Sequence, residues 1–266
     1  GSMWAATAFA RGLRVVQHVR LNDADRFAPA LVYADAVVGV SSHVCDLVRA
    51  RVGSAVRVEH VPDGVCLDAR AVRPDAVPAP NAERPFLCLC LGRVEPAKGQ
   101  LRVLDVFEAL RQRVRCRLVL IGPCGRDAAY CDEVRDRIEA QAVRGDITWE
   151  PFRYPVDDLY AAADVVLVGS RNEALGMVGL EALAAGVLLV AQRTTGYEAI
   201  LDPSKQEGLL FERDEPAAAI ADRIVVALGA AASYGRNGRR KVEAPFDARA
   251  TAGPLERLWQ QTAALR

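Results

Sequence analysis

The sequence predicts an α/β protein built on parallel sheets, and two observations lead to this fold class. The first is a series of short apolar runs, rich in Val, Leu and Ile, in which hydrophobic residues are continuous rather than alternating. Strands that are covered on both faces have this pattern. The second is that segments of helical period lie between several of the runs. Strands and helices that alternate along a chain form a parallel sheet flanked by helices.

Seven apolar runs are expected to form strands. They are residues 14–19, 35–40, 56–62, 85–92, 116–122, 164–170 and 186–192. Helical spacing marks residues 99–114, 128–143, 177–186 and 215–231, and a last helix is expected from about Asp247. The alternation is clearest from about residue 85 onward. A Pro- and Ala-rich stretch at 71–85 breaks it and is predicted to be a linker between a smaller α/β piece and a fuller domain.

Composition excludes some classes of function. The chain has 34 Lys plus Arg and 34 Asp plus Glu, so no global field would hold a nucleic-acid backbone. No run of apolar residues is long enough to span a bilayer. The cluster Arg239, Arg240 and Lys241 is interpreted as a solvated turn before the last helix. These observations argue against nucleic-acid binding and against a membrane span, while peripheral contact with anionic lipid stays open.

The seven cysteines form no CxxC pair, and several lie in apolar runs. We expect them to be small buried hydrophobic residues in a reducing compartment rather than metal ligands. No secretory signal follows the initial Gly-Ser-Met, so a cytoplasmic protein is expected.

The stretch "GRVEPAKGQ" (92–100) is the first candidate site. Gly92 and Arg93 follow a predicted strand, and Lys98 precedes a predicted helix, although lysine occurs only three times among the 34 basic residues. Ligands of open parallel sheets bind at the carboxyl ends of strands, where a helix N-terminus attracts anions. Arg supplies a planar fork and Lys a compact charge, so the pair could hold a diphosphate. The alternative is two solvated surface charges.

The second candidate site is "SRNEALGMVGLEALAAG" (170–186). Glu173 lies in the loop after a predicted strand, Gly176 permits close approach of the backbone, and Glu181 lies one turn inside the next helix. If that helix begins after Gly176, the free N–H groups at Met177 and Val178 point at the same crevice as Arg93 and Lys98. Carboxylates accept paired hydrogen bonds from vicinal diols. The alternative for each Glu is an acid that offsets the helix dipole.

With these motifs in view, the chain resembles the C-terminal half of GT-B glycosyltransferases, specifically the retaining enzymes of glycosyltransferase family 4. The matching motifs occur in the family's order and cover about three quarters of the chain. They are "VPDGV" (61–65), "GRVEPAKG" (92–99), "LVLIGPCG" (118–125), "DDLYAAADVVLVGSRNEALGMVGLEALAAG" (157–186), "TTGYEAI" (194–200) and "PFDARATAGPLERLW" (245–259). Asp63 replaces the Asn that is usual at the domain junction.

The resemblance implies a GT-B type architecture of Rossmann-like domains. Residues 65–245 would form the C-terminal nucleotide-sugar-binding domain, residues 4–64 the remnant of an N-terminal acceptor-side domain, and residues 246–266 a C-terminal helix. His18, in the N-terminal remnant, would face the sugar.

The resemblance also assigns roles in donor binding. Arg93 and Lys98, beside Gly92, would bind the diphosphate together with main-chain N–H groups from Gly176 to Val178. Other residues would bind the rest of the donor. Glu173 is expected to bind hydroxyls of the sugar, Glu181 the ribose diol, Phe152 and Arg153 with Pro151 the nucleobase, and Glu198 is a weaker donor-side candidate. No metal and no cofactor are expected beyond the nucleotide diphosphate sugar itself.

The function implied is transfer of a sugar, with retention, from a nucleotide diphosphate sugar to a saccharide or lipid-linked acceptor in bacterial polysaccharide or glycoconjugate assembly. The enzyme would work in the cytoplasm or at the inner membrane. One alternative is a nucleotide-sugar-binding half that is inactive without an N-terminal portion or a partner chain, and a homodimer is also open. A dinucleotide-dependent oxidoreductase is disfavoured because no GxGxxG follows a strand.

Overall fold

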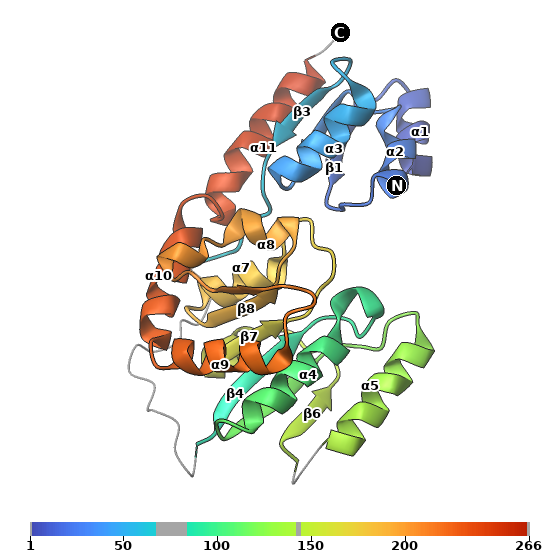
Figure 1. Cartoon of the computed structure of the whole chain (residues 1–266). Coiled ribbons are helices and arrows are strands. Elements are labelled where there is room, and N and C mark those ends of the chain that lie inside the picture. Colours follow the sequence, from blue (N-terminus) through green and yellow to red (C-terminus); the bar gives the residue numbers. More distant parts are fainter. Residues whose placement is uncertain (1, 68–83, 142–144, 265–266) are drawn as a thin grey trace. The chain divides into compact units, whose positions relative to one another are not determined.

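The computed structural model describes residues 2–67, 84–141 and 145–264, and it shows an α/β chain with two parallel sheets (Figure 1). The chain divides into two compact units. The first consists of Gly1–Cys66, Glu173–Gly176 and Ala244–Arg266, and the second of Leu67–Asn172 and Met177–Glu243. Most of the predicted linker at 71–85 lies outside the described residues.

The first unit has a three-stranded parallel sheet in the order β1-β2-β3, formed by Val16–Val19, Ala36–Gly39 and Arg57–His60. All three strands were predicted from their apolar runs. The central strand β2 is buried along its whole length, which explains its unbroken apolar sequence. The helices of this unit are α1 (Ser2–Ala10), α2 (Ala24–Leu31), α3 (Ser42–Val52) and α11 (Ala248–Ala263).

Three of these helices begin at a side-chain cap. The carboxylate of Asp23 accepts a hydrogen bond from the Arg26 N–H at the start of α2, and the Ser41 hydroxyl accepts one from Val44 in α3. Asp247 caps α11, the last helix, at the residue from which the sequence predicted it to begin. Each cap satisfies a backbone donor that the helix itself leaves unpaired.

The second unit has a six-stranded parallel sheet in the order β6-β5-β4-β7-β8-β9. Its strands are β4 (Phe86–Leu91), β5 (Cys116–Ile121), β6 (Ile147–Glu150), β7 (Val165–Val168), β8 (Leu188–Gln192) and β9 (Leu209–Phe211). Its longer helices are α4 (Gln100–Arg111), α5 (Ala128–Gln141), α7 (Met177–Ala184), α9 (Ala217–Leu228) and α10 (Ala231–Glu243). Two short helices, α6 (Asp157–Ala162) and α8 (Thr195–Ile200), complete the second unit.

Helices cover both faces of this sheet. Cys88 and Cys90 of β4 belong to the core cluster that also contains the apolar residues of α4, α5 and α9, and α4 and α9 lie side by side in Figure 1. The alternate residue Leu89 is equally buried but outside that cluster. On the opposite face, Gly179 of α7 packs so closely that an added Cβ would lie 3.0 Å from the Leu189 side chain. Burial on both faces accounts for the continuous apolar runs.

Two strands of the second unit were not predicted, and both are edges of the sheet. β6 and β9 are only 4 and 3 residues long. An edge strand needs less apolar sequence than a central one, so "ITWE" and "LLF" lack the long hydrophobic runs that marked the inner strands. The predicted α4, α5, α7 and α9 are confirmed.

The interpretation of Arg239, Arg240 and Lys241 as a solvated turn is wrong, because all three lie in helix α10. Arg239 donates a hydrogen bond to the carbonyl of Ala184, and the Lys241 ammonium lies 3.8 Å from Glu207. The charges of Arg239 and Lys241 are thus paired within the protein, whereas Arg240 is exposed and donates to the Asn237 side chain. Gly235 and Gly238 are buried in the same helix, so the polar sequence concealed an apolar contact face.

The expectation that all seven cysteines are small buried hydrophobic residues is also wrong. Cys124 and Cys131 form a disulfide, although the other five cysteines have free thiols. The two cysteines are 7 residues apart, a spacing that unlike CxxC carries no signature in the sequence. Four of the free cysteines are buried as predicted, whereas Cys66 is exposed. Burial raises the pKa of Cys90 to about 12, so that thiol stays protonated.

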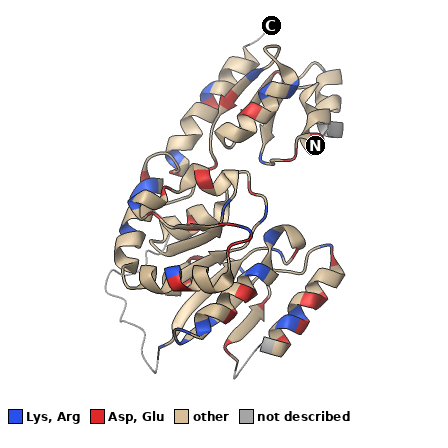
Figure 2. Ribbon diagram, viewed as in Figure 1, with Lys and Arg blue, Asp and Glu red and all other residues tan. Residues whose placement is uncertain are grey.

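Acidic and basic side chains are interleaved in the described residues. Figure 2 shows red and blue alternating along α5 rather than gathering into one field. No single described helix is long and apolar enough to cross a membrane; the bent pair α9 and α10 meets the length and composition criteria only when the two are taken together.

Candidate functional site

The sheet of the second unit has a switch point between β4 and β7. From β4 the chain continues to β5 on one side, whereas β7, its other neighbour, is reached later and leads to β8 and β9. Connections after β4 and β7 therefore leave in opposite directions. A crevice forms at the carboxyl ends of strands where this happens, and ligands of open α/β sheets bind there. Loop 92–99 follows β4 and residues 169–176 follow β7.

Loop 92–99 brings its two predicted cations to one end of β4. Gly92 has a φ of 138° and Gly99 a φ of 63°, values that side chains disfavour, so the loop can turn sharply at both ends. Between them, Pro96–Lys98 forms a single 3-10 turn. The Lys98 stem folds back over the start of the loop, where its Cγ would lie 4.0 Å from a Cβ at Gly92.

The loop is bound to the end of β7. A Cβ added to Gly99 would lie 2.0 Å from the carbonyl oxygen of Gly169, which means that the two backbones are in direct contact. The Arg171 N–H also donates to the carbonyl of Ala97 at 2.9 Å. Lys98 is therefore held against the chain segment that leads away from β7.

The other side of the loop is bound to the end of β5. The Val94 N–H donates to the Pro123 carbonyl, and the Gly125 N–H donates to the Val94 carbonyl, both at 2.9 Å. Cys124, which follows Pro123, forms a disulfide with Cys131 of α5. The Cys131 sulfur lies 3.4 Å from the Val94 carbonyl oxygen. Backbone contacts on both sides thus fix a loop that contains two cations.

Arg93 lies at the surface of this loop. Its side chain is 62% exposed, and its guanidinium is 3.2 Å from the Glu95 carboxylate. The buried side-chain amide of Gln100 donates to the Arg93 carbonyl at 2.9 Å and fixes the backbone behind it. An exposed ion pair of this kind contributes little stability, so Arg93 can exchange Glu95 for an anionic ligand at small cost.

Helix α7 begins at Met177, as the sequence predicted, after Gly176 with a φ of 93°. Met177 and Val178 are partly exposed at its first turn, where backbone N–H groups have no partner within the helix. Glu181 lies one turn further along and is also partly exposed. One oxygen of its carboxylate, Oε2, accepts a 2.8 Å hydrogen bond from the Tyr160 hydroxyl of α6.

Three of the predicted site residues belong to the first unit: His18, Glu173 and Gly176. The Glu173 backbone is held there by the Asn22 side-chain amide, which donates to its carbonyl at 2.6 Å. Asn22 follows strand β1, and no motif in the sequence pointed to it.

The side chain of His18 lies near the ion pair of Asp63 and Arg20, within the first unit. Its Nε2 is 3.9 Å from the Asp63 carboxylate, which pairs with the Arg20 guanidinium at 2.7 Å. Burial lowers the pKa of His18 below its usual value, while Asp63 raises it and Arg20 lowers it. The imidazole is therefore neutral at pH 7. A neutral imidazole in this position can accept or donate a hydrogen bond.

The loop after β6 contains Phe152 and Arg153. Phe152 is 59% exposed, whereas Arg153 makes two hydrogen bonds to Asp158, at 3.0 and 2.6 Å, which lower the pKa of that carboxyl. Beside this loop is a cavity of about 450 Å³. Its lining includes Pro151 and Trp149, whose indole N–H donates to the Gly122 carbonyl at 2.8 Å. No motif in the sequence pointed to Trp149.

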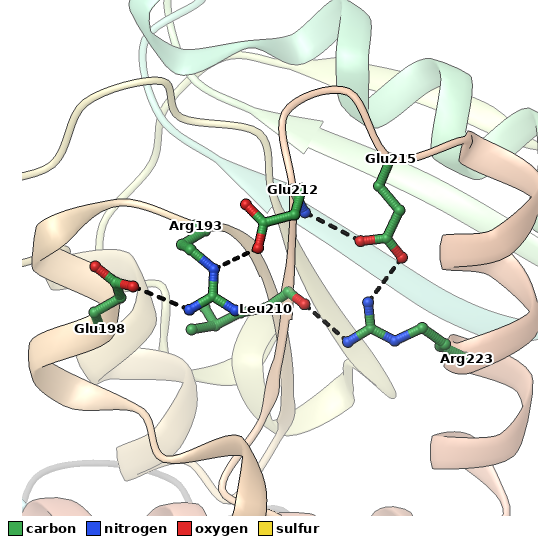
Figure 3. Close-up of polar contacts among 6 residues, drawn as sticks. All are labelled: Arg193, Glu198, Leu210, Glu212, Glu215 and Arg223. Carbon is green, nitrogen blue, oxygen red and sulfur yellow. Dashed lines mark hydrogen bonds and ion pairs between the residues drawn. The ribbon is translucent and has the colours of Figure 1, made fainter.

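Glu198 lies in a network of charges, shown in Figure 3. Its carboxylate is 3.0 Å from Arg193, which also pairs with Glu212 at 2.6 Å. Glu212 and then Glu198 raise the pKa of Arg193. Glu215 continues the network by accepting from the Glu212 N–H and from Arg223. Since Glu198 already shares a guanidinium, its role in donor binding stays a prediction.

In the part of the chain that the structure describes, no group of three or more His, Cys, Asp or Glu side chains could hold a metal ion. Metal independence itself stays a prediction.

Known proteins resemble this chain in sequence and in fold. A family model described as "Glycosyl transferases group 1" matches residues 74–239. The D-inositol 3-phosphate glycosyltransferase of Kineococcus radiotolerans is 35% identical over 169 residues, or 57% of this chain and 38% of that protein. The GDP-mannose-dependent alpha-(1-6)-phosphatidylinositol monomannoside mannosyltransferase of Mycobacterium tuberculosis is 31% identical over 225 residues, or 74% of this chain and 56% of that protein. The chain thus spans 38% to 56% of the length of these relatives.

Solved structures match most of the chain. Anabaena HepE, crystallised with UDP and glucose, matches with a TM-score of 0.81 and 19% identity over 97% of this chain and 74% of that one. Sucrose-phosphate synthase from Thermosynechococcus elongatus matches with a TM-score of 0.80 and 22% identity over 97% of this chain and 70% of that one. The predicted fold class, GT-B type Rossmann-like α/β, is confirmed.

Proposed function

The chain belongs to the glycosyl transferases group 1 family, and we propose that it binds a nucleotide diphosphate sugar in its second unit and transfers the sugar to an acceptor hydroxyl with retention at the anomeric carbon. The observation on which this rests is the placement of Arg93 and Lys98 at the switch point of the six-stranded sheet, with the start of α7 after the neighbouring strand. Retention and membership of glycosyltransferase family 4 rest on the resemblance of motifs described above.

Charge stabilisation of the leaving group is the main task of such a site. As the bond between the anomeric carbon and the diphosphate oxygen breaks, its electron pair moves to that oxygen, and negative charge grows on the diphosphate. Arg93, Lys98 and the N-terminus of α7 would stabilise this charge. The acceptor oxygen forms the new bond to the anomeric carbon on the same face, and its proton passes to the departing phosphate oxygen.

The remaining predicted residues would position the donor. Glu181 would bind the ribose diol, Glu173 the hydroxyls of the sugar, and the loop with Phe152 and Arg153 the nucleobase. The roles proposed for His18 and Glu173, which belong to the first unit, rest on the resemblance of motifs alone. Each is a group that can hydrogen-bond or stack on the part of the donor assigned to it. A hexose donor is the class suggested by the relatives, whose names include a mannosyltransferase.

A second candidate function is nucleotide-sugar binding without transfer by this chain alone. It is favoured by the share of the relatives' length that the chain covers and by the size of the first sheet, which has three described strands against six in the second. An acceptor site would then need further residues from another polypeptide or from a longer form of this protein. The setting we propose, polysaccharide or glycoconjugate assembly at the cytoplasmic face of a bacterial membrane, is common to both functions.

Calorimetric titration in EDTA tests the proposal. We expect one of UDP, GDP or ADP, and the corresponding nucleotide sugar, to bind the chain and to bind Glu181→Ala at least about tenfold more weakly. Failure of all three nucleotides to bind would refute donor binding by this chain. Release of nucleoside diphosphate from the bound donor, with the product configuration read by NMR, separates transfer from binding alone; an inverted product would overturn retention.

A further inference from the structure

A hydrogen bond between Tyr160 and Glu181 links helices α6 and α7. The inference drawn from it rests on the proposed function, in which Glu181 binds the ribose. Tyr160 is fully buried, with 0% of its side chain exposed, and it projects from the short helix α6. Its hydroxyl lies 2.8 Å from Oε2 of Glu181 on α7. The sequence places these residues 21 positions apart, and no motif identified Tyr160 as part of a site. A hydroxyl this deeply buried needs a partner, and its partner here is an ionisable group that reaches solvent.

We propose that Tyr160 is a positioning residue that presents the Glu181 carboxylate to the ribose of the nucleotide. A carboxylate is an acceptor with about four lone-pair sites. The Tyr160 hydroxyl holds Oε2 in place, and the two hydroxyls of a vicinal diol would hydrogen-bond to the same carboxylate when the nucleotide binds. The bond from Tyr160 also restricts rotation of the glutamate side chain, whose conformational freedom would otherwise be lost when the nucleotide binds.

The surroundings of the two residues support a positioning role for Tyr160 and a ligand-binding role for Glu181. On α7 the neighbours Leu180, Ala182 and Leu183 are fully buried, so Glu181 lies at the boundary between the packed face and the exposed face of the helix. Tyr160 approaches it from the buried side. A donor that reaches the carboxylate from the protein interior does not itself cover the part of Glu181 that is exposed to solvent. Tyr160 itself has no exposed atoms with which to touch that ligand.

The proposal is specific to the ribose hydroxyls, which gives it a direct test. Dissociation constants would be measured for the nucleoside diphosphate that binds best and for its 2′-deoxy and 3′-deoxy analogues. For the unmodified chain we expect the ribonucleotide to bind more tightly than either analogue. In Tyr160→Phe the ribonucleotide should bind about tenfold more weakly, while the deoxy analogues change little, so the preference for ribose is reduced.

Two further variants separate positioning from general loss of structure. Tyr197→Phe removes a hydroxyl from the other fully buried tyrosine of this unit and should keep the ribose preference. In a Glu181→Gln background, Tyr160→Phe should add no further loss, because it acts through the carboxylate. Equal weakening of the ribonucleotide and its analogues in Tyr160→Phe, or no weakening at all, would overturn the inference while leaving nucleotide binding intact. Absence of binding to the unmodified chain would instead remove the proposed function, and this inference with it.

Discussion

At the scale of single residues, the cluster of His18, Arg20 and Asp63 allows a prediction about protonation. Burial lowers the pKa of His18, the Asp63 carboxylate at 3.9 Å raises it, and the Arg20 guanidinium lowers it. Asp63→Asn should therefore lower the pKa of His18 further, and Arg20→Ala should raise it. Titration of the imidazole C–H resonances by NMR measures both. Shifts of the same sign in the two variants would contradict this description of the cluster.

The lowered pKa of His18 also predicts how the stability of the fold changes with pH. Burial lowers its pKa in the folded state, so in mild acid the unfolded chain binds a proton that the folded chain does not. Its contribution to stability is present above the usual pKa of about 6.5 and is lost as the pH falls through the lowered value. Urea denaturation at pH 7 and pH 5 should show a smaller loss of stability in His18→Gln than in the unmodified chain. An equal or larger loss in the variant would assign acid sensitivity to other groups.

At the scale of elements, the backbone contact between Gly99 and Gly169 holds loop 92–99 against the end of β7. Gly99→Ala adds a Cβ that would lie 2.0 Å from a backbone oxygen, at a φ of 63° that already disfavours a side chain. We expect destabilisation by about 3 kcal/mol, together with weaker nucleotide binding. Gly145→Ala is the matched control, since its φ is 74° with nothing within 4 Å, and it should cost only about 1 kcal/mol. Similar costs for the two in urea denaturation would show that the backbone contact is unimportant.

The disulfide between Cys124 and Cys131 supports the same loop from the side of β5. It closes a short loop, so Cys124→Ser should lower the free energy of unfolding by about 2 kcal/mol, chiefly by freeing the unfolded chain. Cys66→Ser, which changes an exposed free thiol, should have little effect. Thermal denaturation with and without a dithiol reductant provides a second readout. A chain whose stability does not respond to the reductant or to Cys124→Ser would have no such bond in solution.

Elements differ in how far the sequence predicts them. The inner strands β4, β7 and β8 are buried on both faces, and burial requires the continuous apolar runs that predict them. The inner strand β5 is buried on one face, whereas on the other face Arg117 is exposed and Val119 is partly exposed. β6 and β9 are edges and have no such requirement. Helix α10 was hidden because its face toward the protein consists of small residues and paired charges rather than a hydrophobic stripe.

At the site, the sequence could identify residues that act through position along the chain. Lys98 and Met177 follow strands and begin or precede helices, so strand order alone brings them to one edge of the sheet. Tyr160, Asn22 and Trp149 act through side-chain contacts across the fold, with partners 21, 151 and 27 residues away. No local spacing encodes such contacts, which is why they emerged only from the structure.

At the scale of the whole molecule, we predict that the chain self-associates through its first unit. β1 is an edge of the described sheet, and the same unit exposes Phe9, Leu13 and Val32 by 58%, 58% and 74%. Unpaired strand edges and exposed apolar side chains favour pairing with a second copy. Light scattering should show a dimer whose fraction rises with concentration and falls in Val32→Asp. A single monomeric species at all concentrations would refute the prediction.

The central claim is that loop 92–99 in the second unit binds the diphosphate of a nucleotide, and one comparison tests it most directly. Dissociation constants for the preferred nucleoside diphosphate and the matching monophosphate would be measured for the unmodified chain, for Lys98→Ala and for Lys205→Ala, an exposed lysine paired with Asp202. We predict that Lys98→Ala weakens the diphosphate about tenfold and the monophosphate much less, while Lys205→Ala changes neither. An unchanged preference for the diphosphate in Lys98→Ala would contradict the claim and move the site elsewhere in the chain.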